Sequence, residues 1–169
     1  MNKMRDVRIE KIVLNIGVGE AGEKLMKAEK VLKLLTNKKP IQTISRKTIR
    51  DWGIRRKMPI GTKVTLRGPG AEDFLKRALS IRNNSLPSYC FDSHGNFSFG
   101  IADYTDFEGM KYDPEIGVVG LDINVTLCRP GYRVLRRKIA PHRVSSRHRV
   151  TRTDGIEFTK AKFSLEVIG

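Results

Sequence analysis

Residues 46–61, RKTIRDWGIRRKMPIG, combine six cationic side chains with one acid, Asp51, and the only tryptophan of the chain, Trp52. The cations are Arg46, Lys47, Arg50, Arg55, Arg56 and Lys57. A segment that folds by burying apolar area would not carry so many like charges, because they repel one another. The composition therefore predicts that these residues bind a polyanion whose charge neutralises theirs.

A second cationic segment lies near the C-terminus. Residues 129–152 hold nine Lys and Arg and no acid, and residues 46–67 hold eight with one acid, whereas the rest of the chain is close to neutral. These two segments account for the net charge of +15, which indicates a localised binding footprint. Nucleic acid is the first candidate partner and an acidic membrane surface the second. A charged face that is merely solvated is the remaining alternative.

The patterns that would support catalysis or a metal site are weak. GVGEAG, at residues 17–22, stands between a strand pattern and a helix pattern, as a dinucleotide fingerprint requires, but residues 37–46 contain no acid to hold a ribose. The three histidines are scattered, and the two cysteines form no CxxC pair. We therefore expect no enzymatic activity, no cofactor and no metal. The glycines are explained by a tight turn, whose N–H groups could still meet an RNA phosphate.

The N-terminal residues MNKMRDVRIEK lack the apolar region of a signal peptide, and no stretch approaches 18 apolar residues. We expect a soluble, cytoplasmic protein without a membrane partner or a small-molecule substrate.

Apolar periodicity predicts the elements that must position the cations. Strands are expected at residues 8–16, 41–46, 62–67, 96–101 and 118–128, and helices at residues 20–36 and from residue 69 to before Pro87. Thr151 and Asp154 have the spacing of a capping box, which predicts a short terminal helix with Ile156 and Phe163 on its inner side. The segment of residues 46–61 thus connects two strands.

These elements predict an α+β fold, a two-layer sandwich in which an antiparallel sheet has helices on one face and an open polar face on the other. The open face would display Lys11, Asn15, Lys63, Thr65, Arg67, Asn124 and Thr126. No aromatic ring is among them, so contacts to the backbone and grooves of a folded RNA fit better than base stacking. We expect a single domain over residues 1–169. It would carry a protruding basic loop (residues 46–60), a linker-like basic extension (residues 129–150) and a C-terminal helix and tail (residues 151–169).

Three stretches carry a family resemblance over nearly the whole chain. They are KIVLNIGVGEAGEKLMKAEKVLKLLTNKKPIQTISRKTI, GIRRKMPIGTKVTLRG and GNFSFGIADYTDFEGMKYDPEIGVVGLDINVTL. Together they resemble the universal large-subunit ribosomal protein number five, the 5S rRNA-binding family. RDWGIRR and RPGYRVLRRK resemble its archaeal and eukaryotic branch.

The resemblance implies a structural constituent of the large ribosomal subunit, without enzymatic activity, that binds 5S rRNA and helps attach it to 23S rRNA in the central protuberance. Asn15, Gln42, Thr43, Thr65 and Arg67 correspond to the polar 5S-contacting surface of the family. With their charged neighbours, the rRNA-binding residues expected are Lys11, Asn15, Gln42, Thr43, Arg46, Lys63, Thr65, Arg67, Arg133, Arg136 and Arg137.

The basic loop corresponds, by the same resemblance, to the loop that reaches the P-site tRNA. The tRNA-binding residues expected are Lys47, Arg50, Trp52, Arg55, Arg56 and Lys57. Trp52 would either anchor the base of the loop or stack on a nucleotide, and the anchor is favoured.

Residues 103–115 form an acidic loop with five acids and one lysine. This loop corresponds to the contact with a small-subunit head protein, of the S-thirteen family, at an intersubunit bridge. The bridge residues expected are Asp106, Glu108, Asp113 and Glu115. A solvated loop that prevents unwanted RNA contact is the alternative. For the whole chain the alternative is a non-ribosomal nucleic-acid-binding protein, although no helix-turn-helix, zinc finger or basic zipper is visible.

Overall fold

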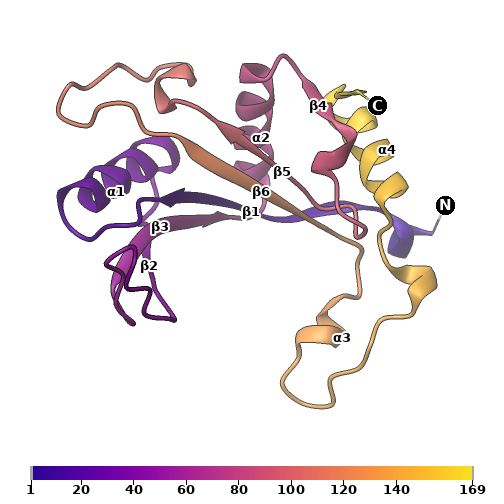
Figure 1. Ribbon diagram of the computed structural model, residues 1–169. Helices are drawn as coiled ribbons and strands as arrows, with labels where there is room; N and C mark the ends of the chain where they lie inside the picture. Colours follow the sequence, from indigo (N-terminus) through magenta and orange to yellow (C-terminus); the bar gives the residue numbers. More distant parts are fainter. Residues whose placement is uncertain (1, 169) are drawn as a thin grey trace. The chain divides into compact units, whose positions relative to one another are not determined.

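The computed structural model describes residues 2–168 (Figure 1). Its strands are β1 (Arg8–Gly17), β2 (Ile41–Ile44), β3 (Pro59–Leu66), β4 (Ser85–Pro87), β5 (Phe97–Ile101), β6 (Leu121–Cys128) and β7 (Glu166–Ile168). Its α-helices are α1 (Glu23–Thr36), α2 (Pro69–Ile81), α3 (Arg133–Arg136) and α4 (Arg152–Phe163). Short 3-10 turns occur at Lys3–Arg5, Ser88–Cys90, Tyr104–Asp106 and Ser146–His148.

Five strands form the main sheet, in the order β2-β3-β1-β6-β5. β2 and β3 pair antiparallel, with Ile41 opposite Lys63, and a shift of register interrupts the ladder between Thr43 and Ile44. β4 and β7 form a separate two-stranded parallel sheet. The combination of a mostly antiparallel sheet with helices confirms the predicted α+β, two-layer class.

The alternation predicted for the strands is present. Ile12, Leu14 and Ile16 of β1 are buried, whereas Lys11, Val13 and Asn15 between them are partly accessible. β3 buries Val64 and Leu66 and exposes Lys63 and Thr65, and β6 buries Leu121, Ile123, Val125 and Leu127. Because successive side chains of a strand point to opposite faces, one face of each strand is apolar and the other polar.

Backbone contacts divide the chain into two compact units. The first unit consists of the chain up to Ile12, Arg67–Ser98 and the chain from Val125 onward; the second consists of Val13–Leu66 and Phe99–Asn124. α2, α3, α4, β4 and β7 lie in the first unit, and α1, β2 and β3 lie in the second. α1 packs on β3 and buries Leu25 and Leu32, whereas α2 buries Phe74 and Leu75 in the core of the first unit.

Several element boundaries differ from the predicted ones. α1 begins at Glu23 rather than at residue 20, β2 ends at Ile44, β3 begins at Pro59, and β6 begins at Leu121. β2 is shorter than predicted because its register shifts at Thr43/Ile44. The parallel pair of β4 and β7 was not predicted, since three-residue strands carry no measurable periodicity.

The capping box that opens α4 is confirmed. The Asp154 N–H donates to the Thr151 hydroxyl (3.3 Å), and the Thr151 N–H donates to the Asp154 carboxylate (2.9 Å). Phe163 is buried as predicted, but Ile156 is only half-buried, and Gly155 and Thr159 occupy the inner side of the helix instead.

Gly155 is buried because α4 approaches the turn before β5 very closely. A methyl group on Gly155 would lie 2.6 Å from the carbonyl oxygen of Gly95 and 2.8 Å from its Cα. Gly70 in α2 has free space around it instead, because a methyl group there would meet nothing within 4 Å.

We expect Gly155→Ala to lower the free energy of unfolding by about 1–3 kcal/mol, since backbone must move to admit the methyl group. The matched control, Gly70→Ala, should leave stability unchanged or raise it by up to about 1 kcal/mol, because alanine favours the helical backbone. Urea denaturation of both variants makes the comparison. Equal stability of the two variants would show that α4 does not approach the Gly95 turn this closely.

Candidate nucleic-acid interface

The basic loop continues the β2–β3 hairpin beyond the sheet. The Ser45 N–H donates to the Met58 carbonyl (2.8 Å), and the Lys57 N–H donates to the Ser45 carbonyl (2.8 Å). Nearer the tip, Ile49 and Ile54 exchange two backbone hydrogen bonds of 2.8 and 3.0 Å. The cations are thus carried on a hydrogen-bonded hairpin.

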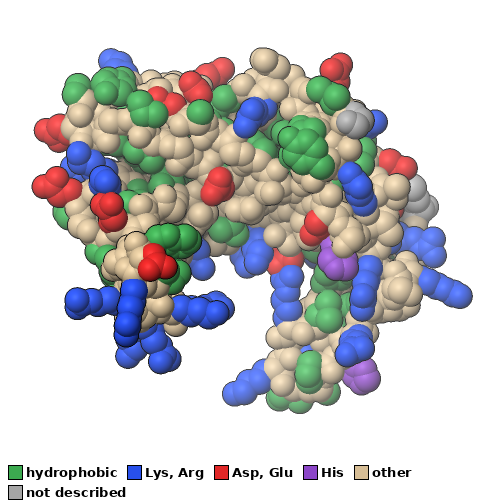
Figure 2. All heavy atoms as spheres, in the orientation of Figure 1, with side chains coloured by type: hydrophobic (Ala, Val, Ile, Leu, Met, Phe, Trp, Pro, Cys, Tyr) green, Lys and Arg blue, Asp and Glu red, His purple; other side chains and the backbone are tan. Residues whose placement is uncertain are grey.

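The six cations of this hairpin are all exposed, and Figure 2 shows Lys and Arg side chains gathered at its tip. Within residues 2–168, none of the six is in an ion pair. Their charges are therefore not neutralised by acids of the described residues, which is compatible with a phosphate-binding surface.

Trp52 does not anchor the hairpin. Its side chain is 72% exposed, whereas Ile54 is only 7% exposed. The favoured prediction for Trp52 is therefore wrong. Ile54 has the anchoring role instead, because its apolar side chain is buried where it bridges to Ile49. The large ring of Trp52 remains accessible to a partner.

The strand residues predicted to bind rRNA fall into two groups. Lys63 and Thr65 of β3 are exposed, and Lys11 and Asn15 of β1 are half-buried between the apolar residues of that strand. Gln42 differs from them, because its amide nitrogen donates to the carboxylate of Glu29 on α1 (2.8 Å). Gln42 and Thr43 are adjacent in β2 and so point to opposite faces. The expectation that both lie on one polar surface is wrong.

Two of the expected rRNA-binding arginines meet at an acid. Arg136 forms a bidentate ion pair with Glu10, in which its Nη2 lies 2.6 Å from Oε2 and its Nη1 contacts Oε1. The Arg67 Nη1 lies 3.6 Å from the same Oε1 and donates to the Glu10 carbonyl oxygen (3.3 Å). The Glu10 side chain is only 10% exposed. Glu10 of β1 is thus paired with Arg67, which follows β3, and with Arg136 of α3, and all three residues lie in the first unit.

The hydrogen bonds from Arg136 lower the pKa of Glu10 below its ordinary value. Partial burial acts in the opposite direction, but the charges of Arg136, Lys11 and Arg67 add to the lowering. Glu10 is therefore ionised wherever the protein is folded near neutral pH. It neutralises part of the charge that Arg67 and Arg136 would otherwise offer to RNA.

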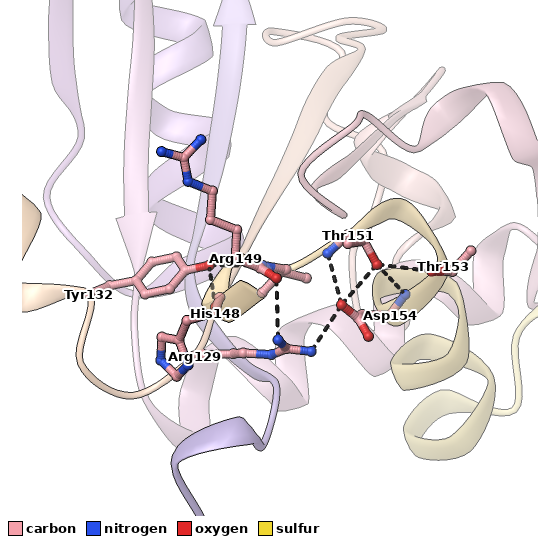
Figure 3. Close-up of polar contacts among 8 residues, drawn as sticks. Arg129, Tyr132, His148, Arg149, Thr151, Thr153 and Asp154 are labelled. Carbon is pink, nitrogen blue, oxygen red and sulfur yellow. Dashed lines mark hydrogen bonds and ion pairs between the residues drawn. The ribbon is translucent and has the colours of Figure 1, made fainter. Parts of the chain in front are cut away.

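The basic extension is folded against the start of α4 and does not have the character of a linker (Figure 3). The Tyr132 hydroxyl accepts a hydrogen bond from the Val150 N–H (2.9 Å), and His148 Nε2 lies 2.8 Å from the Pro130 carbonyl oxygen. Arg129 lies 2.9 Å from Asp154 and is only 12% exposed. The expected rRNA contacts Arg133 and Arg137 are exposed, and the Arg137 Nε donates to Ala140 within the same turn.

Asp154 closes this cluster. Burial opposes its ionisation, but hydrogen bonds from the backbone and hydroxyl of Thr151, together with the charge of Arg129, hold the pKa of Asp154 below its ordinary value. Sequence reasoning missed the roles of Glu10, Arg129 and Tyr132. The role of Glu10 could have been inferred from the sequence, because Glu10 is an acid in a predicted strand that also carries residues of the predicted cationic surface.

The acidic loop is anchored by aromatic side chains. Tyr104 and Phe107 are buried, and the Tyr104 hydroxyl accepts a hydrogen bond from the Asp113 N–H (3.2 Å). Among the residues predicted to form a protein bridge, Asp113 is half-buried and accepts from the Glu115 N–H (2.9 Å). The other three, Asp106, Glu108 and Glu115, are exposed.

Two backbone N–H groups of the glycine-rich GVGEAG turn are bonded within the protein. The N–H groups of Val18 and Gly19 both donate to the Ile60 carbonyl oxygen, at 3.0 and 2.8 Å. Gly19 has a φ of +79°, which fits a tight turn that favours glycine. These two N–H groups are therefore not available to a phosphate, which corrects the expectation that they could bind one.

Among residues 2–168, no helix has the length and apolar character needed to span a membrane. The same residues contain no group of three or more His, Cys, Asp and Glu side chains arranged to hold a metal ion.

Comparison with known proteins shows that this chain is a protein of the large ribosomal subunit. Residues 2–55 match the family described as Ribosomal protein L5, and residues 59–158 match the C-terminal part of the same ribosomal family. Large ribosomal subunit protein uL5 of Thermoplasma volcanium is 48% identical over 169 residues, which cover 99% of each chain. The protein of the same name from Methanoregula boonei is 49% identical over 164 residues, covering 97% of this chain and 99% of its own.

The chain therefore belongs to the ribosomal L5 family, and its relatives named above are archaeal. The family resemblance and its archaeal character, inferred from the sequence, are confirmed. Members of this family are structural constituents of the large subunit in the cytoplasmic ribosome and not enzymes.

We expect Glu10→Gln to lower the free energy of unfolding by about 1 kcal/mol at neutral pH, because Arg136 and Arg67 lose their charged partner while both remain more than half exposed. Since the pKa of Glu10 is lowered by folding, its contribution is present above the unfolded value of about 4.3 and is lost as the pH falls through the folded value.

Urea denaturation of wild type and variant between pH 7 and pH 3 tests this expectation. The difference in stability should be constant down to about pH 5 and shrink below it. Glu157→Gln is the matched control, because Glu157 is exposed on α4. A difference that persists unchanged at pH 3 would contradict the ionic role of Glu10.

Proposed function

We propose that the chain binds 5S rRNA and helps attach it to 23S rRNA in the central protuberance of the large subunit. Membership of the ribosomal L5 family supports the ribosomal setting. Lys63 and Thr65, which are exposed on β3, and Lys11 and Asn15, which are partly accessible on β1, supply charged and hydrogen-bonding groups to an RNA backbone.

The β2–β3 hairpin contacts the P-site tRNA in this proposal. The observation that carries this assignment is that six exposed cations, outside any ion pair in residues 2–168, lie on the same hairpin as an exposed tryptophan at its tip. Backbone phosphates neutralise cations of this kind, and an accessible indole can stack on a base. The tip has the composition of an RNA-contacting finger.

The acidic loop contacts a small-subunit head protein of the S-thirteen family at an intersubunit bridge. Asp106, Glu108 and Glu115 are exposed on a loop whose base is held by Tyr104 and Phe107. A negative loop complements a basic ribosomal protein and repels RNA, so it favours a protein partner over rRNA.

Binding to 5S rRNA should fall by about 1–3 kcal/mol in Lys63→Ala if this ammonium group meets a phosphate directly. Lys30→Ala is the matched control, because Lys30 is exposed on α1 in the same unit and carries the same charge. Filter binding across a series of salt concentrations gives the affinities.

The same measurement separates the ribosomal function from general nucleic-acid binding. A steep fall of log affinity with log salt is expected for any nucleic acid, but a 5S-specific protein keeps its preference for that RNA over duplex DNA at raised salt. Equal affinity for both nucleic acids would favour the non-ribosomal alternative.

Arg55→Ala combined with Arg56→Ala should leave the affinity for isolated 5S rRNA nearly unchanged and weaken tRNA binding to the P site of reconstituted ribosomes. The reason is that both arginines lie in the hairpin, outside the β1 and β3 residues assigned to 5S rRNA. Lys30→Ala combined with Lys33→Ala is the control, because it removes the same charge from exposed positions of α1. A large loss of 5S affinity in the double arginine variant would refute this division of labour.

A further inference from the structure

A cavity of about 280 Å³ lies in the first unit, where the basic extension folds over β6. Its apolar lining comes from Leu127, Leu135, Val150 and the ring of Tyr132. Arg136 and Arg149 also line it. This volume lies just below the usual range of ligand pockets, about 300–1,000 Å³, so it admits one flat group and not a duplex.

Several polar groups along the walls are already bonded. Tyr132 is fixed by its hydrogen bond from Val150, and the Asn96 amide oxygen accepts from the Leu127 N–H (3.0 Å). The Asn96 amide nitrogen donates to Asp92 (2.9 Å). An occupant would meet the apolar walls and the ring of Tyr132, together with His94 and Thr126, which also line the cavity.

The charge at the cavity selects an anion. The Nε of Arg149 donates to the Val144 carbonyl oxygen (3.3 Å), and its guanidinium extends away from the bonded cluster in Figure 3. Glu10 is beside Arg136, but its carboxylate is already paired with Arg136 and Arg67. Nine cations in residues 129–152 disfavour a cationic occupant, and a bare phosphate would leave the apolar lining uncovered.

We propose that this cavity takes one unstacked nucleotide of a bound rRNA, with its base against Tyr132, Leu135 and Val150 and its phosphate at Arg149. The inference rests on the proposed rRNA binding and adds a base-binding site to it. Because the contact is by stacking and apolar packing, it tolerates different bases and favours the larger purines.

Methyl NMR of the full-length protein tests the cavity directly, with AMP, CMP, ribose 5-phosphate and inorganic phosphate as separate probes. AMP should shift the methyl resonances of Leu127, Leu135 and Val150, CMP should shift them less, and the two probes without a base should leave them in place. Equal shifts with inorganic phosphate, or none with AMP, would overturn the proposal.

Leu135→Trp tests whether the nucleotide belongs to RNA, because an indole at this position fills the cavity. Ile139→Trp is the matched control, since Ile139 is 83% exposed in the same extension and does not line the cavity. Affinities for 5S rRNA and for the central-protuberance domain of 23S rRNA are measured separately, and circular dichroism confirms that both variants are folded.

Leu135→Trp should abolish the AMP shifts and weaken binding of one of the two RNAs about tenfold, the scale of one stacked base. Unchanged affinity for both RNAs would overturn an RNA source for the nucleotide. Failure of the wild-type protein to bind either RNA would instead refute the proposed function, so the two failures are distinguishable.

Discussion

Repulsion among the cations of residues 129–152 is the constraint on which the arrangement of the first unit depends. Nine positive charges without an acid repel one another, so any internal ion pair of this segment must use an acid from elsewhere in the chain. Glu10, from β1, pairs with Arg136, and Asp154, from α4, pairs with Arg129. These two acids hold the extension against the rest of the unit and leave Arg133 and Arg137 exposed.

The basic hairpin, residues 46–60, also carries cations that repel one another, but it does not pair them with acids of the described chain. It contains one acid, Asp51, and none of its six cations is in an ion pair within residues 2–168. Ion-paired arginines such as Arg67 and Arg136 have a partner to exchange when RNA arrives, whereas Arg55 and Arg56 do not. In the proposed RNA complex, a phosphate contact by Arg136 would therefore bring a smaller net gain than one by Arg55, because breaking an internal pair offsets part of it.

The sequence predicted what depends on local pattern. Alternation in residues 8–16 and 118–128 identified the buried faces of β1 and β6, and the Thr151–Asp154 spacing identified the start of α4, because both signals come from neighbours along the chain. It did not predict the Glu10–Arg136 pair, whose members are 126 residues apart, or the close approach of Gly155 to Gly95. Contacts of this kind depend on the packing of distant elements, and composition alone does not encode them.

Trp52 and Gln42 show the same limit within the candidate site. A lone tryptophan among cations is compatible with an anchor or with an exposed ring, and the 72% exposure of Trp52 decides between them. Gln42 is polar, as a residue on an RNA-facing surface would be, yet Glu29 on α1 holds its amide. In a two-layer fold a polar strand residue can satisfy its hydrogen bonds on the helix side, so polarity identifies accessible positions but not the face to which they belong. The direction of each side chain, rather than its type, therefore determines which of the predicted residues can meet RNA.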